Sequence, residues 1–179
     1  MKTEALLFDV FGTGVDWRPS VAEQCAAVLP GSVDSFAFAD RWRSLYQPSM
    51  EQVRCGAREF TRLDVLHLES LRVVLSEFGV DLPESTIVEL NRVWHRLTPW
   101  PDSIDGLTRL KSRFIVAPLS NGNVSLLLDM AKNAGLPSKP ESARSCRGPG
   151  STGPSIASEA CSASSSIRAA PSATSMTPW

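Results

Sequence analysis

The first reactive side chain of the sequence, Asp9, comes directly after a continuous apolar run over residues 5–8. Such a run is typical of a strand that is buried on both faces of a parallel sheet. Ligands of open α/β sheets bind at the carboxyl ends of strands, so a carboxylate there is held rigidly and is accessible. We expect Gly12 and Thr13 to turn the backbone and to leave N–H groups facing the carboxylate. The plainer interpretation is an aspartate that only caps a loop.

A second apolar run, over residues 114–119, also ends in small polar residues, Ser120, Asn121 and Gly122. Two strands with such ends can converge on one crevice. A carboxylate can act as a nucleophile, and a hydroxyl and an amide can bind an anion beside it. The competing interpretation is a plain Ser-Asn-Gly turn, which is common in proteins.

Helical patterns fill the stretch between the two runs and flank the second one. Apolar spacing, a Ser20–Glu23 capping box and Gly or Pro stop signals predict the helices. Their expected bounds are 20–30, 36–46, 60–78, 83–97, 103–111 and 124–133. In the last helix we expect Val124, Leu127, Leu128 and Ala131 to share the apolar side. Strands that alternate with helices favour an α/β fold.

The composition is that of a soluble globular protein, with 179 residues, a net charge of -1 and 42% apolar residues. It gives no sign of a nucleic-acid or membrane partner. The start lacks a basic n-region, and no stretch has the length of a membrane span. The four cysteines show no C-x-x-C spacing. We expect free thiols, a cytoplasmic location, and neither a metal nor another cofactor.

Taken together, the segments resemble the haloacid dehalogenase superfamily, and most closely its type II L-2-haloacid dehalogenases. The resemblance covers residues 4 to about 137 and rests on Asp9–Thr13, Trp42-Arg43, Gln47–Met50, Leu63–His67, Trp94–Leu97, Pro99–Asp102 and Ser120–Gly122. It implies a HAD-like, Rossmann-like doubly wound parallel-sheet core at 1–14 and 99–137, incomplete in this chain. A helical cap would occupy 15–98. Residues 138–179 would form a low-complexity tail, disordered or aberrant.

The resemblance also implies roles for residues. Asp9 would attack C2 of a 2-haloacid, and water would hydrolyse the aspartyl ester to a 2-hydroxyacid. Thr13 would orient Asp9, and Arg43 would receive the halide. Ser120 and Asn121 would bind the substrate carboxylate and the halide. Arg41 competes with Arg43 for its role, and a solvated helix face is the plainer interpretation of either arginine.

An apolar substrate pocket is the expected role of several further residues. They are Val10, Phe11, Trp42, Tyr46 and Phe60. For each aromatic residue taken singly, packing in the core or on the surface is the plainer interpretation. His67 and His95 are predicted to be structural, because neither has a carboxylate or cysteine partner at useful spacing. A homodimer is a candidate assembly.

Two alternatives to the dehalogenase stand beside it. Phosphatases of the superfamily carry an aspartate two residues after the nucleophile, where this chain has Phe11, which cannot donate a proton. The other alternative is an inactive truncated or frame-shifted product. Type II enzymes carry a catalytic lysine some thirty residues after the position of Ser120 and a later acidic residue. This chain has Lys139, too early for that lysine, and no aspartate after Asp129.

Overall fold

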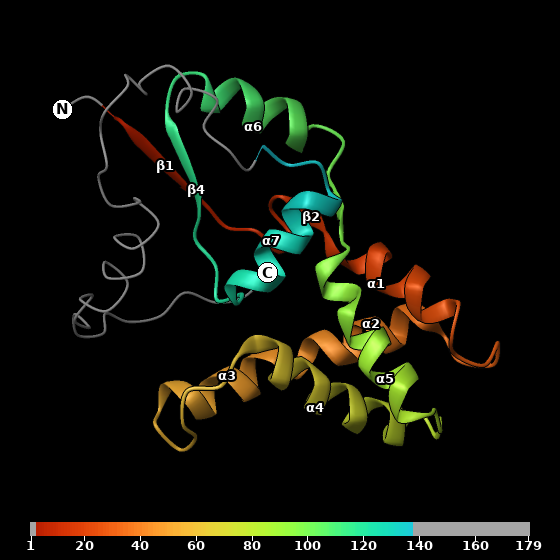
Figure 1. Ribbon diagram of the computed structural model, residues 1–179. Helices are drawn as coiled ribbons and strands as arrows, with labels where there is room; N and C mark the ends of the chain where they lie inside the picture. The colour runs from red at the N-terminus through yellow and green to blue at the C-terminus, as the bar shows by residue number, and fades with distance from the viewer. Residues whose placement is uncertain (1–2, 138–179) are drawn as a thin grey trace, which may run out of the picture. The chain divides into compact units, whose positions relative to one another are not determined.

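The computed structural model describes residues 3–137, which lie in the first of two compact units, Met1–Pro140. The predicted tail, 138–179, lies outside the described residues. A mixed α/β fold with a parallel pair of strands is observed, which confirms the predicted fold class (Figure 1). In the described part of the chain, no helix is long and apolar enough to cross a membrane.

Two strands from distant parts of the sequence form the parallel sheet. They are β1 (Ala5–Phe8) and β4 (Ile115–Pro118), with Ala5 opposite Ile115 and Phe8 opposite Pro118. The expectation that β1 is buried on both faces is wrong for the described structure, because Leu7 is 63% exposed. The physical reason is that only these two strands make up the sheet within residues 3–137, so much of its surface has no neighbour.

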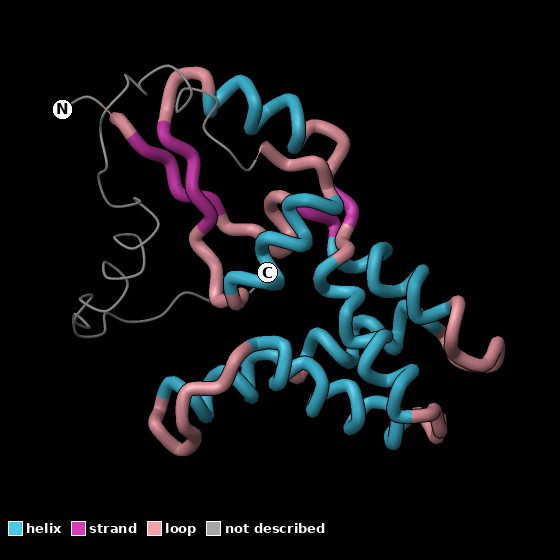
Figure 2. The backbone as a smooth tube through the Cα atoms, viewed as in Figure 1, coloured by secondary structure: helices cyan, strands magenta, loops and turns pink. Residues whose placement is uncertain are grey.

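A helical insertion separates the two strands and begins and ends at one place (Figure 2). At its base β2 (Val15–Asp16) pairs antiparallel with β3 (Thr98–Pro99). Trp100 adds a hydrogen bond from its Nε1 to the Gly12 carbonyl oxygen, 3.2 Å long. This ribbon coincides with the predicted limits of the cap, although the division into core and cap stays a prediction.

The insertion contains five α-helices and one short 3-10 helix. They are α1 (Trp17–Ala26), α2 (Ser35–Ser44), α3 (Tyr46–Arg54), α4 (Leu63–Glu77), α5 (Glu84–Asn91) and η1 (Arg92–His95). After the insertion, α6 (Ser103–Lys111) precedes β4 and α7 (Val124–Asn133) follows it. The bounds of α6 and α7 agree with the sequence prediction.

Local signals at the first helices were partly misleading. The predicted capping box at Ser20 is wrong, because α1 begins at Trp17 and Ser20 lies buried in its first turns. The Ser20 hydroxyl donates to the Asp16 carbonyl oxygen and accepts from the Thr98 backbone N–H at 3.0 Å. The serine therefore ties α1 to the β2–β3 ribbon.

Helix α3 was missed because Pro48 was expected to disturb the end of the preceding helix. Instead α2 ends at Ser44, and Pro48 lies in the first turn of α3. A proline is tolerated there, because the first N–H groups of a helix have no intrahelical acceptor. Asp34 caps α2, since its carboxylate accepts from the backbone N–H groups of Phe36 and Ala37 at 2.9 and 3.2 Å.

The buried core is centred on Trp94 of η1. Its ring lies 5.4 Å from that of Trp42 and 4.5 Å from that of His67, between ring centroids, and Trp17 and Phe11 pack around it. Other fully buried side chains come from α1, α2, α4 and α7: Val21, Phe38, Leu66, Leu71, Val74, Leu126 and Met130. The insertion thus supplies most of the core.

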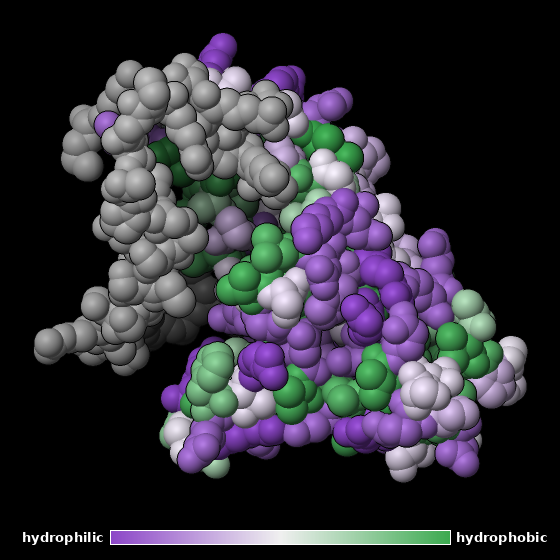
Figure 3. Space-filling view, viewed as in Figure 1, coloured by the Kyte–Doolittle hydropathy of each residue, from purple (hydrophilic) through white to green (hydrophobic). Residues whose placement is uncertain are grey.

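Helix α7 buries a different face from the predicted one. Leu126 and Met130 are buried, whereas Val124 is 72% and Leu128 is 48% exposed. Figure 3 shows hydrophobic surface over this helix. The apolar residues of α7 surround much of the helix, so their spacing could not select the side that packs against η1.

Candidate functional site

Asp9 lies at the carboxyl end of β1, beside the end of β4. The Leu119 backbone N–H donates to the Phe8 carbonyl oxygen at 2.7 Å, which extends the parallel pairing by one residue. Asp9 and Ser120 therefore leave the sheet at the same edge, as the sequence predicted. The Asp9 carboxylate is exposed, and Thr13 donates to its Oδ2 from Oγ1 at 3.1 Å. This bond restricts the carboxylate through Oδ2, and the other oxygen, Oδ1, takes no part in it.

The turn after Asp9 closes on itself. The backbone N–H groups of Thr13, Gly14 and Val15 all donate to the Val10 carbonyl oxygen, and that of Gly12 donates to Val15. The expectation that N–H groups of Gly12 and Thr13 face the carboxylate is therefore wrong, because the turn itself uses them. Gly12 has a φ of +94°, a conformation that side chains with a Cβ rarely adopt.

Arg43 of α2 lies on aromatic rings. Its guanidinium carbon is 4.4 Å from the centroid of the Tyr46 ring and 5.8 Å from that of the Trp17 ring. A cation over an aromatic face is attracted by the ring quadrupole. The competing candidate, Arg41, forms an ion pair with Glu77 at 2.7 Å. Because that carboxylate already neutralises Arg41, Arg43 is the better placed of the two to meet an anion.

The loop after β4 reaches the same aromatic group. The Asn121 amide donates from Nδ2 to Tyr46 Oη at 2.8 Å, and Ser120 Oγ accepts from the Gly122 backbone N–H at 3.2 Å. A Cβ at Gly122 would lie 3.0 Å from the Leu127 side chain, so a larger residue there would force Leu127 to shift. Asn121, Tyr46 and Arg43 are thus connected side by side.

The remaining predicted pocket residues take different places. Val10 is buried, and the half-buried Phe11 packs edge-on against Trp94 with ring centroids 6.3 Å apart. Trp42 belongs to the core, where its Nε1 donates to the His67 carbonyl oxygen at 3.0 Å. Phe60 precedes α4 and is 87% exposed. The structure therefore gathers Tyr46 with the polar site residues, whereas Phe60 lies on the surface.

Asp9 does not line either of two clefts that lie among residues 3–137. One, of about 570 Å³, lies along α6 at Asp105 and Arg109. The other, of about 430 Å³, lies between η1 and α7 at His95 and Asp129. The site around Asp9 is instead an open edge of the sheet. Within this described part, no three His, Cys, Asp or Glu side chains are arranged so that they could hold a metal ion.

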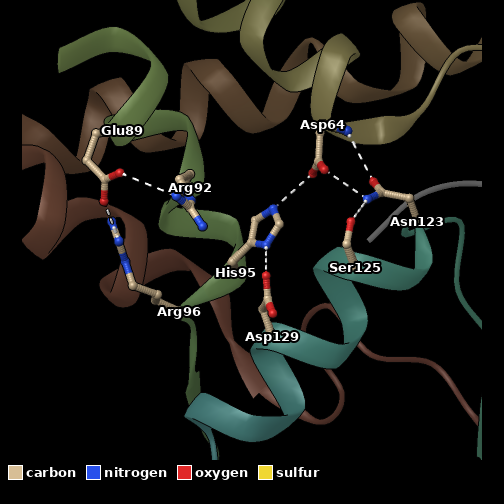
Figure 4. Close-up of polar contacts among 8 residues, drawn as sticks. All are labelled: Asp64, Glu89, Arg92, His95, Arg96, Asn123, Ser125 and Asp129. Atoms are coloured by element: carbon tan, nitrogen blue, oxygen red, sulfur yellow. Dashed lines mark hydrogen bonds and ion pairs between the residues drawn. The ribbon is translucent and has the colours of Figure 1, made fainter. Parts of the chain in front are cut away.

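His95 corrects one sequence prediction. It was expected to lack a carboxylate partner, but its ring nitrogens lie 3.1 Å from Asp64 and 3.0 Å from Asp129 (Figure 4). These partners are 31 and 34 residues away in the sequence, so no local spacing could have revealed them. Only the approach of α4, η1 and α7 creates the cluster.

Two further titratable groups are confined to the core. Burial lowers the pKa of His67 to about 3, with smaller contributions from the charges of Arg43 and His95. Burial raises the pKa of the Cys25 thiol to about 12. His67 is therefore neutral, as befits a structural residue, and Cys25 is an inert thiol.

Comparisons with known proteins point to one enzyme family. No protein-family model matches the chain. Haloacetate dehalogenase H-2 of Moraxella sp. (strain B) is 26% identical over 136 residues, which cover 75% of this chain and 59% of that protein. Across the curated relatives the chain spans 51% to 59% of their length.

Similar solved structures point to the same enzyme family. The crystal structure of a defluorinating L-2-haloacid dehalogenase is 55% identical with a TM-score of 0.73, over 76% of this chain and 58% of that one. The L-2-haloacid dehalogenase of Xanthobacter autotrophicus with chloropropionic acid covalently bound is 28% identical with a TM-score of 0.68, over 76% and 54%. The predicted resemblance and the HAD-like fold are confirmed.

Proposed function

Since the described part of this chain belongs with the L-2-haloacid dehalogenases of the haloacid dehalogenase superfamily, we propose that the protein hydrolyses L-2-haloacids to 2-hydroxyacids. The observation that carries the proposal is the exposed Asp9 carboxylate, restricted by Thr13 at the edge where both strands end. A carboxylate so placed is a suitable nucleophile for covalent catalysis. The cytoplasmic location and the homodimer stay predictions.

The proposed reaction has two steps. A carboxylate oxygen of Asp9 attacks C2 of the substrate, a C–O bond forms, and the C–halogen bond breaks so that halide leaves with the electron pair. Water then attacks the carboxyl carbon of the ester, and the 2-hydroxyacid leaves with the oxygen that made the attack. One proton is released to solvent, and Asp9 is regenerated with one oxygen from water.

The neighbouring side chains have roles that fit this sequence of steps. Arg43 is a cation beside the loop of Asn121, and both can stabilise the negative charge that develops on the halide. Ser120 offers a hydroxyl to the substrate carboxylate. Tyr46 connects Arg43 to Asn121, and its ring is an apolar surface for the substrate.

The phosphatase alternative finds less support in the side chains around Asp9. The second position after it is Phe11, whose ring packs against Trp94 and has no proton to donate to a leaving alcohol. A halide needs no such proton, so this position suits carbon–halogen cleavage. The inactive alternative concerns the chain beyond residue 137 and is tested by turnover itself.

Halide release from 2-chloropropionate by the purified protein is the direct test. We expect release that is abolished in Asp9→Asn, since an amide is a far weaker nucleophile than a carboxylate. In a single turnover in heavy-oxygen water, mass spectrometry should find the label in Asp9. Full activity of Asp9→Asn would end the proposal, and release of phosphate from an aryl phosphate in place of halide would favour the phosphatase.

A further inference from the structure

A half-buried histidine, His95, joins three elements through two carboxylates on opposite sides of its ring. His95 of η1 lies between Asp64 of α4, at 3.1 Å from Nε2, and Asp129 of α7, at 3.0 Å from Nδ1 (Figure 4). The three side chains are 12%, 29% and 44% exposed, in that order. We call these three residues the carboxylate clasp.

The number of protons on the His95 ring determines how many carboxylates the ring can donate to. A neutral imidazole carries one N–H, so it can donate to only one carboxylate and turns a lone pair toward the other. A doubly protonated ring donates at both nitrogens, and both bonds are then charge-assisted. The observed geometry places a carboxyl oxygen at each nitrogen, so the ring contacts α4 on one side and α7 on the other.

Asp64 also holds the loop that follows β4. Its Oδ2 accepts from Asn123 Nδ2 at 2.8 Å, while Oδ1 faces His95. Asn123 is the N-cap residue of α7, and its side chain accepts from no backbone N–H of that helix, although its Nδ2 also donates to Ser125 Oγ of α7 at 2.7 Å. An N-cap asparagine ordinarily accepts a hydrogen bond from a backbone N–H of its own helix. Here the side chain of Asn123 bonds to Asp64 of α4 instead, so a distant contact replaces the usual local one.

We propose that His95 and Asp64 are positioning residues, which hold the Ser120–Asn123 loop against the helical insertion. His95 contacts Asp64 and α7, and Asp64 holds Asn123. The proposed anion ligands Ser120 and Asn121 precede Asn123, with only Gly122 between them. The role of Ser120 and Asn121 in substrate binding rests on the proposed function, whereas the contacts of the clasp do not depend on it.

Charged groups on all the packed elements act on the ring. Asp64 and Asp129 face its two nitrogens. The other charged or titratable groups around it are Arg92 and Arg96 of η1 and its end, Glu89 of α5, His67 of α4 and Lys132 of α7. Glu89 pairs with Arg96. We expect the loop to loosen when a contact of the ring or of Asp64 is removed.

Nuclear magnetic resonance of the full chain, labelled at the histidine ring nitrogens, tests the clasp between pH 5 and 8.5. The chain has two histidines, so His67 serves as an internal reference that stays neutral. We expect the chemical shifts of the His95 ring nitrogens to change in Asp64→Asn and in Asp129→Asn, because each substitution alters one carboxylate contact of the ring.

Loop mobility is read in the same samples. Amide exchange of Gly122 and Asn123, corrected for intrinsic base catalysis, should become at least about threefold faster in Asp64→Asn than in the unaltered protein. His95→Gln keeps one donor and one acceptor without the ring, and it should also make the exchange faster even if the aspartate variants fold poorly. Asp40→Asn, which neutralises a carboxylate paired with Arg18 on α2, should leave His95 unchanged.

Two results would overturn the clasp. One is a set of His95 ring-nitrogen chemical shifts that neither aspartate variant changes, and the other is a loop exchange rate that is the same in Asp64→Asn, His95→Gln and the unaltered protein. None of these signals requires turnover, so failure of the dehalogenase proposal would leave them intact. Conversely, halide release with unchanged His95 ring-nitrogen shifts in both variants would refute the clasp alone.

Discussion

The helical insertion and the strand edge that carries Asp9 are built on opposite principles. The insertion gathers Trp42, Trp94 and most of the fully buried residues, and its polar atoms largely serve packing. At the strand edge, Asp9 and Thr13 are exposed and Leu7 is 63% exposed. Stability and chemistry are therefore located in different residues, and changes in one region should leave the other's property nearly intact.

Truncation of the central tryptophan should show the largest effect on stability. Trp94→Ala removes the ring around which Trp42, His67, Trp17 and Phe11 pack, so it should lower the free energy of unfolding by about 3–5 kcal/mol. Trp94 Nε1 has no hydrogen-bond partner within the described residues, so the loss comes from packing alone. Urea denaturation measures it.

Two control variants, measured in the same way, test whether the helical insertion and the strand edge differ in their contribution to stability. Val73→Ala, on α4 with a 48% exposed side chain, should change the free energy of unfolding by less than about 0.5 kcal/mol. Asp9→Asn should likewise keep full stability. A large loss of stability in Asp9→Asn would show that the strand edge is part of the stabilising core after all.

The composition of residues 138–179 predicts the largest effect on turnover. A hybrid that joins residues 1–137 to the C-terminal part of the defluorinating relative should have a kcat/KM for 2-chloropropionate at least about a hundredfold above that of the present chain. The reason is the catalytic lysine that type II enzymes carry after the position of Ser120, which the hybrid would regain. A cation between the carboxylate of Asp9 and that of the substrate offsets their repulsion, and losing one such electrostatic group commonly costs a factor of this size. Asp9→Asn in the hybrid controls for the nucleophile, and equal values for hybrid and present chain would contradict the prediction.

Acid should weaken the insertion through His67. Its pKa is about 3 in the folded protein and about 6.5 when unfolded, so its stabilising contribution is complete above pH 6.5 and is lost as the pH falls toward 3. Between pH 7 and pH 5 the free energy of unfolding should fall by roughly 2 kcal/mol for this reason. His67→Phe should remove that loss from urea-denaturation curves. An identical pH slope in the variant and the unaltered protein would show that His67 is not the responsible group.

The smallest expected effect belongs to the bond that orients Asp9. Thr13→Val keeps the shape of the side chain but cannot donate to Asp9 Oδ2. A net hydrogen bond contributes about 1 kcal/mol, so kcat should fall by roughly fivefold to tenfold with stability unchanged. Thr13→Ser should retain most of the activity. If Thr13→Val kept full kcat, the bond would have no role in turnover.

The sequence predicted the elements best where period and stop signals agreed. Helices α6 and α7 begin and end where expected, and the polar ends of β1 and β4 lie together as expected. Predictions failed where tertiary contacts override local signals. Ser20 joins the ribbon rather than a capping box, and Pro48 begins a helix rather than ending one.

The candidate site was predictable as a set of residues but not as an arrangement. The motif around Asp9 and the Ser120–Asn121 pair could be found because each follows an apolar run. The Tyr46–Asn121 bond and the two partners of His95 join residues 31 to 75 positions apart, and sequence spacing carries no information about such pairs. The exposed position of Phe60 likewise depends on where α4 begins.

The β2–β3 ribbon gives the helical insertion the connectivity of a detachable module. Val15 lies opposite Pro99, so the chain enters and leaves the helices within about 5 Å, the spacing of paired residues in an antiparallel ladder. A turn of two residues could join Gly14 to Trp100 without moving β1 or β4, because consecutive Cα atoms are about 3.8 Å apart. The same adjacency would let the excised helices be closed into a ring. Gain, loss or exchange of this segment between homologous genes would thus require no rethreading of the remaining backbone.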